Sequence, residues 1–190
     1  KPTMTKVLFI NPVVREEDVP RHVPYGIALL ASIAMGKGHL VQVYDANAWR
    51  RGPEVLARVL EADDWQVIAL GGITTAYGSI KKIVRAARAA CPKAVIVLGG
   101  GVLTSLPREM MGWLPEVDVG VIGEAFVTFP EILAMIDEGK RDWTKIPGTI
   151  ARDASGALAL SAPRSLLHDL DSLPYPAWDL FPLEEIYFPN

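Results

Sequence analysis

The stretch Ala94-Val-Ile-Val-Leu-Gly-Gly-Gly101 joins an unbroken apolar run to a row of glycines. A strand that is apolar at nearly every position is covered by helices on both faces, as in parallel sheets. The same pattern, an apolar run followed by a turn of small or polar residues, recurs in residues 6–12, 67–75 and 117–124. Because the carboxyl ends of parallel strands meet at one edge of a sheet, the four turns should line the edge where open α/β sheets bind ligands.

Helical segments are expected between these runs. They are predicted over residues 25–35, 53–62, 79–91, from Pro107 onward and over 126–138, with one further strand over residues 40–44. Five such units predict an α/β, flavodoxin-like (Rossmann-like) three-layer sandwich with a five-stranded parallel sheet in the order 2-1-3-4-5. This order places the ligand crevice beside the first strand.

The sequence pattern changes after residue 140. Residues 148–152 and 157–161 flank a glycine-containing turn and predict a short hairpin. Residues 173–182 then combine prolines and aromatic residues without helical or strand periodicity, which is typical of an extended linker. We therefore expect a ligand-binding domain over residues 1–141 and a hairpin with a proline-rich connector over 142–190, leading to a further domain.

Composition excludes several classes of function. The 190 residues carry a formal net charge of −3, so no attraction to nucleic acid or to an anionic membrane is expected. No apolar run approaches the roughly 18 residues that a membrane span requires. Residues 1–5 show no signal-peptide pattern, and a cytoplasmic protein is expected. The single cysteine, Cys91, excludes an iron–sulfur cluster held within these residues.

No catalytic residue can be identified from the sequence. The phosphate-binding pattern GxxxxGK[ST] is absent, and residues 99–104 lack the third glycine of a dinucleotide fingerprint. The three histidines form neither a Ser-His-Asp set nor a metal-ligand spacing. Asp45 is a candidate partner for the ribose of a flavin or nicotinamide nucleotide, although the first loop has no glycines to admit a pyrophosphate. A ligand-free interaction domain is the other alternative.

Several motifs carry a resemblance when they are taken in order. His22-Val-Pro-Tyr-Gly-Ile27 opens an apolar helix, Asp45 ends the second strand, and Gly123-Glu124 is followed by Thr128. Asp169-Leu-Asp-Ser-Leu-Pro174 and Pro176-Ala-Trp-Asp179 follow the hairpin. Together they resemble the cobalamin-binding amino-terminal domain of cobalamin-dependent radical S-adenosylmethionine (SAM) enzymes. This family includes radical SAM methyltransferases and cyclases of the anaerobic Mg-protoporphyrin IX monomethyl ester cyclase type.

The resemblance implies where cobalamin would bind. In this family the corrin ring lies across the carboxyl edge of the sheet, and the nucleotide tail of base-off cobalamin enters a slot beside the central strands. The implied cofactor-binding residues are Pro24, Tyr25, Gly26, Gly71, Gly72, Ile73, Thr74, Thr75, Gly99, Gly100, Gly101, Val102, Gly123, Glu124 and Thr128. A tight turn is the alternative explanation for each glycine. The Gly100→Leu substitution is expected to abolish cobalamin retention and to preserve the fold.

The resemblance also implies a parent enzyme. Its radical SAM domain, expected further along the parent polypeptide, would carry a [4Fe-4S] cluster and bind SAM. The CxxxCxxC motif for that cluster is absent from these 190 residues. The chain is therefore expected to bind cobalamin and not to catalyse a reaction alone. Cobalamin domains of the methionine-synthase type carry Asp-x-His-x-x-Gly after the first strand, where this sequence has Asn11-Pro-Val-Val-Arg15. No protein histidine is expected on cobalt, because His22, the only nearby histidine, has the wrong spacing.

Overall fold

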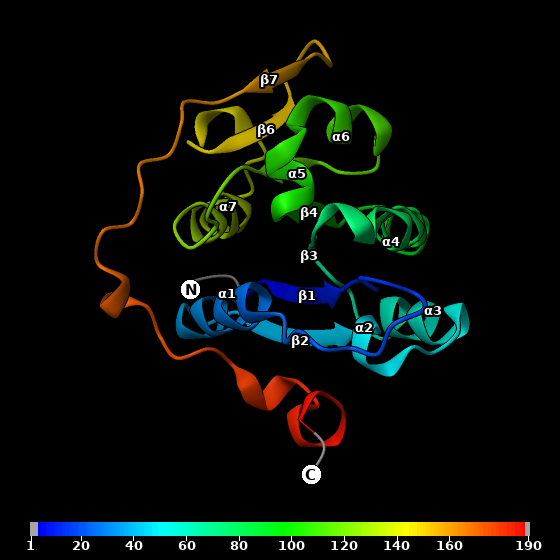
Figure 1. Ribbon diagram of the computed structural model, residues 1–190. Coiled ribbons are helices and arrows are strands. Elements are labelled where there is room, and N and C mark those ends of the chain that lie inside the picture. Colours follow the sequence, from blue (N-terminus) through cyan, green and yellow to red (C-terminus); the bar gives the residue numbers. More distant parts are fainter. Residues whose placement is uncertain (1–3, 189–190) are drawn as a thin grey trace.

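Seven strands form one sheet in the computed structural model of this chain, which describes residues 4–188 (Figure 1). Five of them are parallel and adjacent, in the order β2-β1-β3-β4-β5. The predicted parallel sheet and its strand order are confirmed. These strands are β1 (Lys6–Asn11), β2 (Leu40–Asp45), β3 (Val67–Gly71), β4 (Val95–Gly99) and β5 (Val119–Val121).

Helices cover both faces of the sheet, so the three-layer sandwich is also confirmed. One face carries α1 (Tyr25–Gly36) and α7 (Thr128–Asp137), which lie together on one side of the sheet in Figure 1. The other face carries α3 (Pro53–Glu61), α4 (Tyr77–Ala90) and α6 (Pro107–Trp113). Each face has its own apolar cluster, one built around Phe9 and Phe129 and the other around Ile68 and Ile80.

Local sequence signals account for these elements. Within β1, Val7 and Phe9 face one helical layer and Leu8 and Ile10 face the other, because successive side chains of a strand alternate. Pro53 and Pro107 each occupy the first helical turn, where a missing N–H group costs nothing.

Short helical turns begin within three residues of three strand ends. They are α2 (Ala46–Trp49), the 3₁₀ turn η1 (Thr74–Ala76) and α5 (Gly101–Ser105). None of these turns was among the predicted helices, because such short turns show no apolar periodicity. Asp45 caps α2, since its carboxylate accepts a hydrogen bond from the Ala48 N–H at 2.9 Å. These turns bring main-chain groups close to the carboxyl edge of the sheet.

The predicted hairpin is confirmed, and it extends the sheet. Its strands are β6 (Thr149–Arg152) and β7 (Leu158–Leu160), and β6 pairs antiparallel with β5. The described sheet therefore has seven strands and not the five that we expected. The physical reason is that β5 would otherwise expose a row of unpaired N–H and C=O groups at the edge.

The connector returns along the molecule after β7. It passes α1, where the Ala177 N–H donates to the Ala28 carbonyl at 3.0 Å and the Ser32 hydroxyl donates to the Tyr175 carbonyl at 2.6 Å. It then ends beside β2 (Figure 1). The described region after α7 contains four short helical turns, namely η2 (Trp143–Lys145), η3 (Leu170–Ser172), η4 (Trp178–Leu180) and the π-helical turn η5 (Leu183–Tyr187). Within residues 4–188, no helix has the length and apolar character of a membrane span.

Candidate functional site

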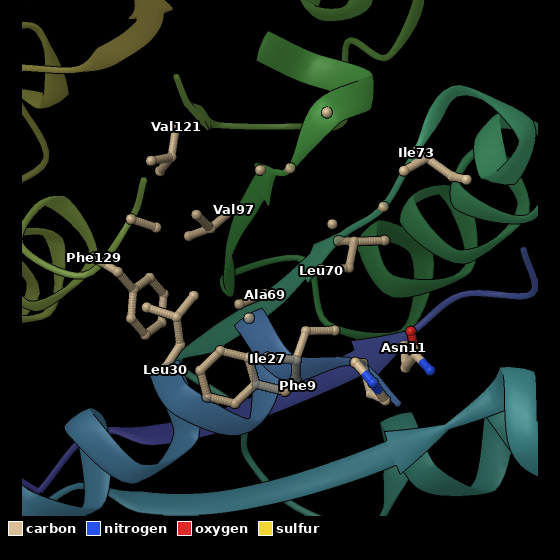
Figure 2. Close-up of a pocket in the computed structure, with 18 of the residues that line it drawn as sticks. Phe9, Asn11, Ile27, Leu30, Ala69, Leu70, Ile73, Val97, Val121 and Phe129 are labelled. Atoms are coloured by element: carbon tan, nitrogen blue, oxygen red, sulfur yellow. The ribbon is translucent and has the colours of Figure 1, made fainter. Parts of the chain in front are cut away.

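A cavity of about 370 Å³ opens at the carboxyl edge of the parallel strands. Its walls come from the ends of β1, β3, β4 and β5, from the start of α1 and from the segment that enters α7. Figure 2 shows the side chains that surround it. The cavity lies where the sequence predicted a ligand crevice, beside the first strand and at the turns that follow strands one, three and four.

The cavity extends down one face of the sheet. Its floor is formed by Phe9, Ala69, Val97 and Val121, which occupy neighbouring strands. Ile27 and Leu30 of α1 and Phe129 of α7 lie on the helical side (Figure 2). This part of the cavity is therefore an apolar slot between the sheet and two helices, which suits the insertion of a flat, largely apolar group.

Two glycines of the rim are required by the backbone. A Cβ atom added at Gly71 would lie 2.9 Å from the Gly99 carbonyl oxygen. Gly100 has a φ of +79°, and a Cβ atom added there would lie 2.8 Å from both N and O of Gly72. Any side chain at Gly100 would thus separate the turns after β3 and β4. The expectation that Gly100→Leu preserves the fold was wrong, because this glycine serves the turn.

Other glycines leave space that a side chain would fill. At Gly99 the nearest atoms to an added Cβ belong to Val121, at 3.9 Å, and at Gly26 no atom lies within 4 Å. Neither residue has a positive φ, and both line the cavity. The absence of side chains at these positions therefore keeps the cavity open, which is the property that a bulky cofactor with a protruding tail requires.

Most of the sequence-predicted site residues meet at this cavity. The lining includes Pro24, Gly26, Gly71, Gly72, Ile73, Gly99, Gly100, Gly101, Gly123 and Glu124. Gly123 also has a positive φ, +74°, so a tight turn accounts for it in part. Residues from four separate turns thus share one site, as the parallel topology predicts.

Five predicted residues do not line the cavity. Tyr25 packs against Trp178, with 6.0 Å between ring centroids, and Thr74 and Thr75 are exposed. Val102 is buried in the core on the opposite face of the sheet. The Thr128 hydroxyl is buried and donates to the Pro147 carbonyl at 3.3 Å. It therefore braces the start of α7 against the segment that precedes β6.

The resemblance implied a slot beside the central strands, but the apolar residues that form it were not among the predicted site residues. Phe9, Ala69 and Val97 lie two residues before Asn11, Gly71 and Gly99, so they share the same face of each strand. This spacing of two residues along each strand was the sequence signal that could have identified the floor of the slot. Leu30 and Phe129 come from helices and Phe126 from the turn that precedes α7, and no local pattern distinguishes a cavity-lining apolar residue from a core residue.

The loop between β1 and α1 is held over the site by Asn47 and Arg50. Arg50 has a φ of 49° and donates to the carbonyls of Glu16 at 3.1 Å and Asp18 at 3.0 Å. The Val14 N–H donates to Asn47 Oδ1 at 3.1 Å. These contacts bring His22, an exposed residue, to the cavity mouth. In the described part of the chain, no three His, Cys, Asp or Glu side chains gather in a way that could hold a metal ion.

Asp45, the candidate partner for a nucleotide ribose, does not line the cavity, and its carboxylate is already hydrogen-bonded. Its buried carboxylate accepts hydrogen bonds from Asn11 Nδ2 at 2.8 Å and from the Tyr187 hydroxyl at 2.6 Å. Burial and the adjacent Asp45 carboxylate raise the pKa of Tyr187 above its ordinary value. Of these three residues, only Asn11 lines the cavity.

A family comparison matches residues 12–133 to the B12 binding domain. Among curated proteins, the chain is 26% identical over 162 residues to an uncharacterized methyltransferase, PH0819, of Pyrococcus horikoshii, covering 85% of this chain and 35% of that protein. It is 27% identical to the anaerobic magnesium-protoporphyrin IX monomethyl ester cyclase of Synechocystis, covering 95% of this chain and 37% of the cyclase. The chain thus spans little more than a third of these relatives.

Solved structures show the same fold at low sequence identity. The radical S-adenosylmethionine methyltransferase TsrM from Kitasatospora setae, with cobalamin and a [4Fe-4S] cluster bound, aligns with a TM-score of 0.73 and 20% identity, covering 91% of this chain and 31% of that chain. The cobalamin-dependent S-adenosylmethionine radical enzyme OxsB, with aqua-cobalamin and S-adenosylmethionine bound, aligns with a TM-score of 0.75 and 15% identity. The alignment covers 93% of this chain and 24% of the OxsB chain. The match to the B12 binding domain family does not favour the nucleotide-binding and ligand-free alternatives.

Proposed function

This chain belongs to the B12 binding domain family, and we propose that its cavity holds cobalamin at the carboxyl edge of the parallel sheet. The observation that carries the proposal is the slot, which combines an apolar floor with a rim of glycines. The glycine rim admits a wide ring, and the slot beneath it accepts the nucleotide tail. Cobalamin, when bound, supplies a cobalt centre that carries a methyl group or transfers an electron.

The residues of this chain have distinct roles in the proposal. Gly26, Gly99 and Gly101 keep the entrance open, and Pro24, Ile73 and Glu124 border it. Phe9, Ala69, Val97 and Phe129 exclude water from the tail of the cofactor. We propose that cobalamin binds base-off and without a histidine on cobalt.

The parent enzyme is a further part of the proposal. Both curated relatives and both solved structures are about three to four times longer than the part that this chain covers. We propose that residues 142–190 lead from the cobalamin domain into a radical SAM domain that holds the [4Fe-4S] cluster and SAM. The reaction class would be methyl transfer or oxidative cyclisation, and this chain would bind the cofactor without turning over substrate. A cytoplasmic location remains the prediction from the sequence.

Cofactor retention tests the proposal directly. Purified protein is mixed with hydroxocobalamin, desalted, and examined by visible absorption. We expect corrinoid absorbance to remain with the protein in a one-to-one ratio. A protein that retains no corrinoid absorbance, and that retains a flavin when it is mixed with one and desalted in the same way, would overturn the assignment.

A further inference from the structure

A buried hydrogen-bonded group lies next to the proposed cobalamin site. It consists of Asn11 at the end of β1, Asp45 at the end of β2 and Tyr187 in the connector, and their exposed fractions are 6%, 2% and 6%. The Tyr187 hydroxyl donates to Asp45 Oδ2 at 2.6 Å, and Asn11 Nδ2 donates to Asp45 Oδ1 at 2.8 Å. Buried polar groups are expensive unless they are paired, so this arrangement holds all three side chains in place.

The chemistry of the carboxylate decides the orientation of the Asn11 amide. An ionised carboxylate only accepts hydrogen bonds, so the NH₂ group of Asn11 must face Asp45. The Asn11 Nδ2 group also lies 3.3 Å from the Tyr187 hydroxyl oxygen. The amide oxygen of Asn11 is therefore turned away from Asp45. Asn11 lines the cavity, and Figure 2 shows its oxygen on the side of Leu70 and its nitrogen turned away from it.

Tyr187 reaches this group from a distant part of the chain. It ends η5, the last helical turn in the described connector, and lies 142 residues from Asp45 in sequence. The Ala48 N–H already occupies one site on Asp45 Oδ1, at 2.9 Å, so Tyr187 completes the set of donors around the carboxylate. If the Tyr187 hydroxyl were removed, Asp45 Oδ2 would lose this buried hydrogen-bond donor.

We propose that the Asn11 side-chain oxygen accepts a hydrogen bond from bound cobalamin, and that Tyr187, through Asp45, is the positioning residue for this contact. The inference rests on the proposed function of the cavity. Cobalamin offers two kinds of donor, the amide side chains of the corrin ring and the ribose hydroxyl of the nucleotide tail. Cofactor affinity then depends on the docking of the connector, and by linkage the bound cofactor stabilises the docked connector.

The dissociation constant for hydroxocobalamin, measured by equilibrium dialysis, tests the inference. Loss of one neutral hydrogen bond corresponds to a roughly threefold to tenfold weaker binding constant, and this is the change expected for Tyr187→Phe. Tyr175→Phe is the matched control, because Tyr175 lies in the same connector with 94% of its surface exposed. Its dissociation constant should equal that of the unchanged chain.

A double-mutant cycle separates positioning from a purely structural role. If Tyr187 acts through Asn11, then Tyr187→Phe should change the affinity by less than about twofold in an Asn11→Ala background. A structural role would weaken binding by the same factor in both backgrounds. Asp45→Asn provides a second variant, because it offers an NH₂ group that favours reversal of the Asn11 amide. It should weaken binding as much as Asn11→Ala does.

Cobinamide, which lacks the nucleotide tail, identifies the donor. If Asn11→Ala weakens the binding of both corrinoids, the donor is a corrin amide, and if it weakens only cobalamin binding, the donor is in the tail. Circular dichroism melting confirms that each variant is folded. Equal cobalamin affinity for the unchanged chain and Tyr187→Phe, or independent effects in the cycle, would overturn this inference. Failure of the unchanged chain to bind any corrinoid would instead overturn the proposed function.

Discussion

Gly99 and Gly100 are neighbours that respond differently to substitution. Gly100 has a positive φ and contacts the backbone of Gly72, so a side chain there disrupts the turn. Gly99 has an ordinary backbone conformation and an open position facing the cavity. Gly99 is therefore the position that separates loss of cofactor from loss of fold.

We expect Gly99→Val to reduce cobalamin retention at least tenfold without abolishing folding. The valine methyl groups would occupy the entrance of the slot, and a β-branched residue suits the end of a strand. Hydroxocobalamin titration and thermal unfolding give the two readouts. Gly112→Val is the control, since Gly112 lies in α6 with no atom within 4 Å of an added Cβ and outside the cavity lining. Equal retention by both variants would contradict a cofactor in the slot.

The ionisation of Tyr187 makes the free energy of unfolding depend on pH. Its pKa is raised in the folded protein, from an ordinary value of 10.0, because of burial and the hydrogen bond to Asp45. The folded state therefore keeps a proton that the unfolded state loses. The stabilisation is fully present below pH 10 and is lost as the pH rises from there toward the folded pKa.

We therefore expect the free energy of unfolding to fall more steeply above pH 10 in the unchanged chain than in Tyr187→Phe. Urea unfolding at a series of pH values measures the difference. The Tyr175→Phe variant, whose phenol is exposed, should keep the steep dependence. Parallel curves for Tyr187→Phe and the unchanged chain would show that Tyr187 ionises normally in the folded state.

At the scale of elements, the junction between β5 and β6 depends on one small residue. Gly120 pairs with Ile150 across the two strands. A Cβ atom added at Gly120 would lie 2.7 Å from Ile150 Cγ2 and 2.7 Å from Leu103 Cδ2. Close packing of this kind leaves no room for an extra methyl group. The hairpin and α5 therefore both pack over Gly120.

We expect Gly120→Ala to lower the free energy of unfolding by about 1–3 kcal/mol, the usual effect of overpacking. Urea unfolding measures this change. Gly112→Ala is the matched control, because alanine in an open helical position is neutral or stabilising by up to about 1 kcal/mol. If Gly120→Ala were as stable as the control, β6 could not be packed against β5 as the structure shows.

At the scale of the whole molecule, the cavity follows from the strand order. In the order 2-1-3-4-5 the chain leaves β1 toward one face and β3 toward the other, so their connections diverge and leave a crevice between them. The two apolar clusters on opposite faces of the sheet are consistent with this topology. The cofactor site thus lies at a position that the fold leaves open, and the glycines keep it accessible.

Much of the architecture was predictable because its signals are local. The apolar runs, the glycine turns and the helical periodicity of residues such as Ile80, Ile83 and Ala87 each act over a few residues, and together they predicted the parallel strands and their order. The rim of the cavity was predictable for the same reason. The loops at the carboxyl edge of the sheet contain the glycines, and these are visible in the sequence.

Only the tertiary structure decided how distant segments meet. It placed β6 on the open edge of β5, Tyr187 on Asp45 across 142 residues, and Thr5 on Asp137 across 132 residues. It also decided that Gly100 serves a turn and that Gly99 borders a cavity, because that distinction depends on which atoms lie opposite each glycine. Contacts between residues so far apart leave no period or spacing in the chain, since they are selected by packing and by the pairing of buried polar groups.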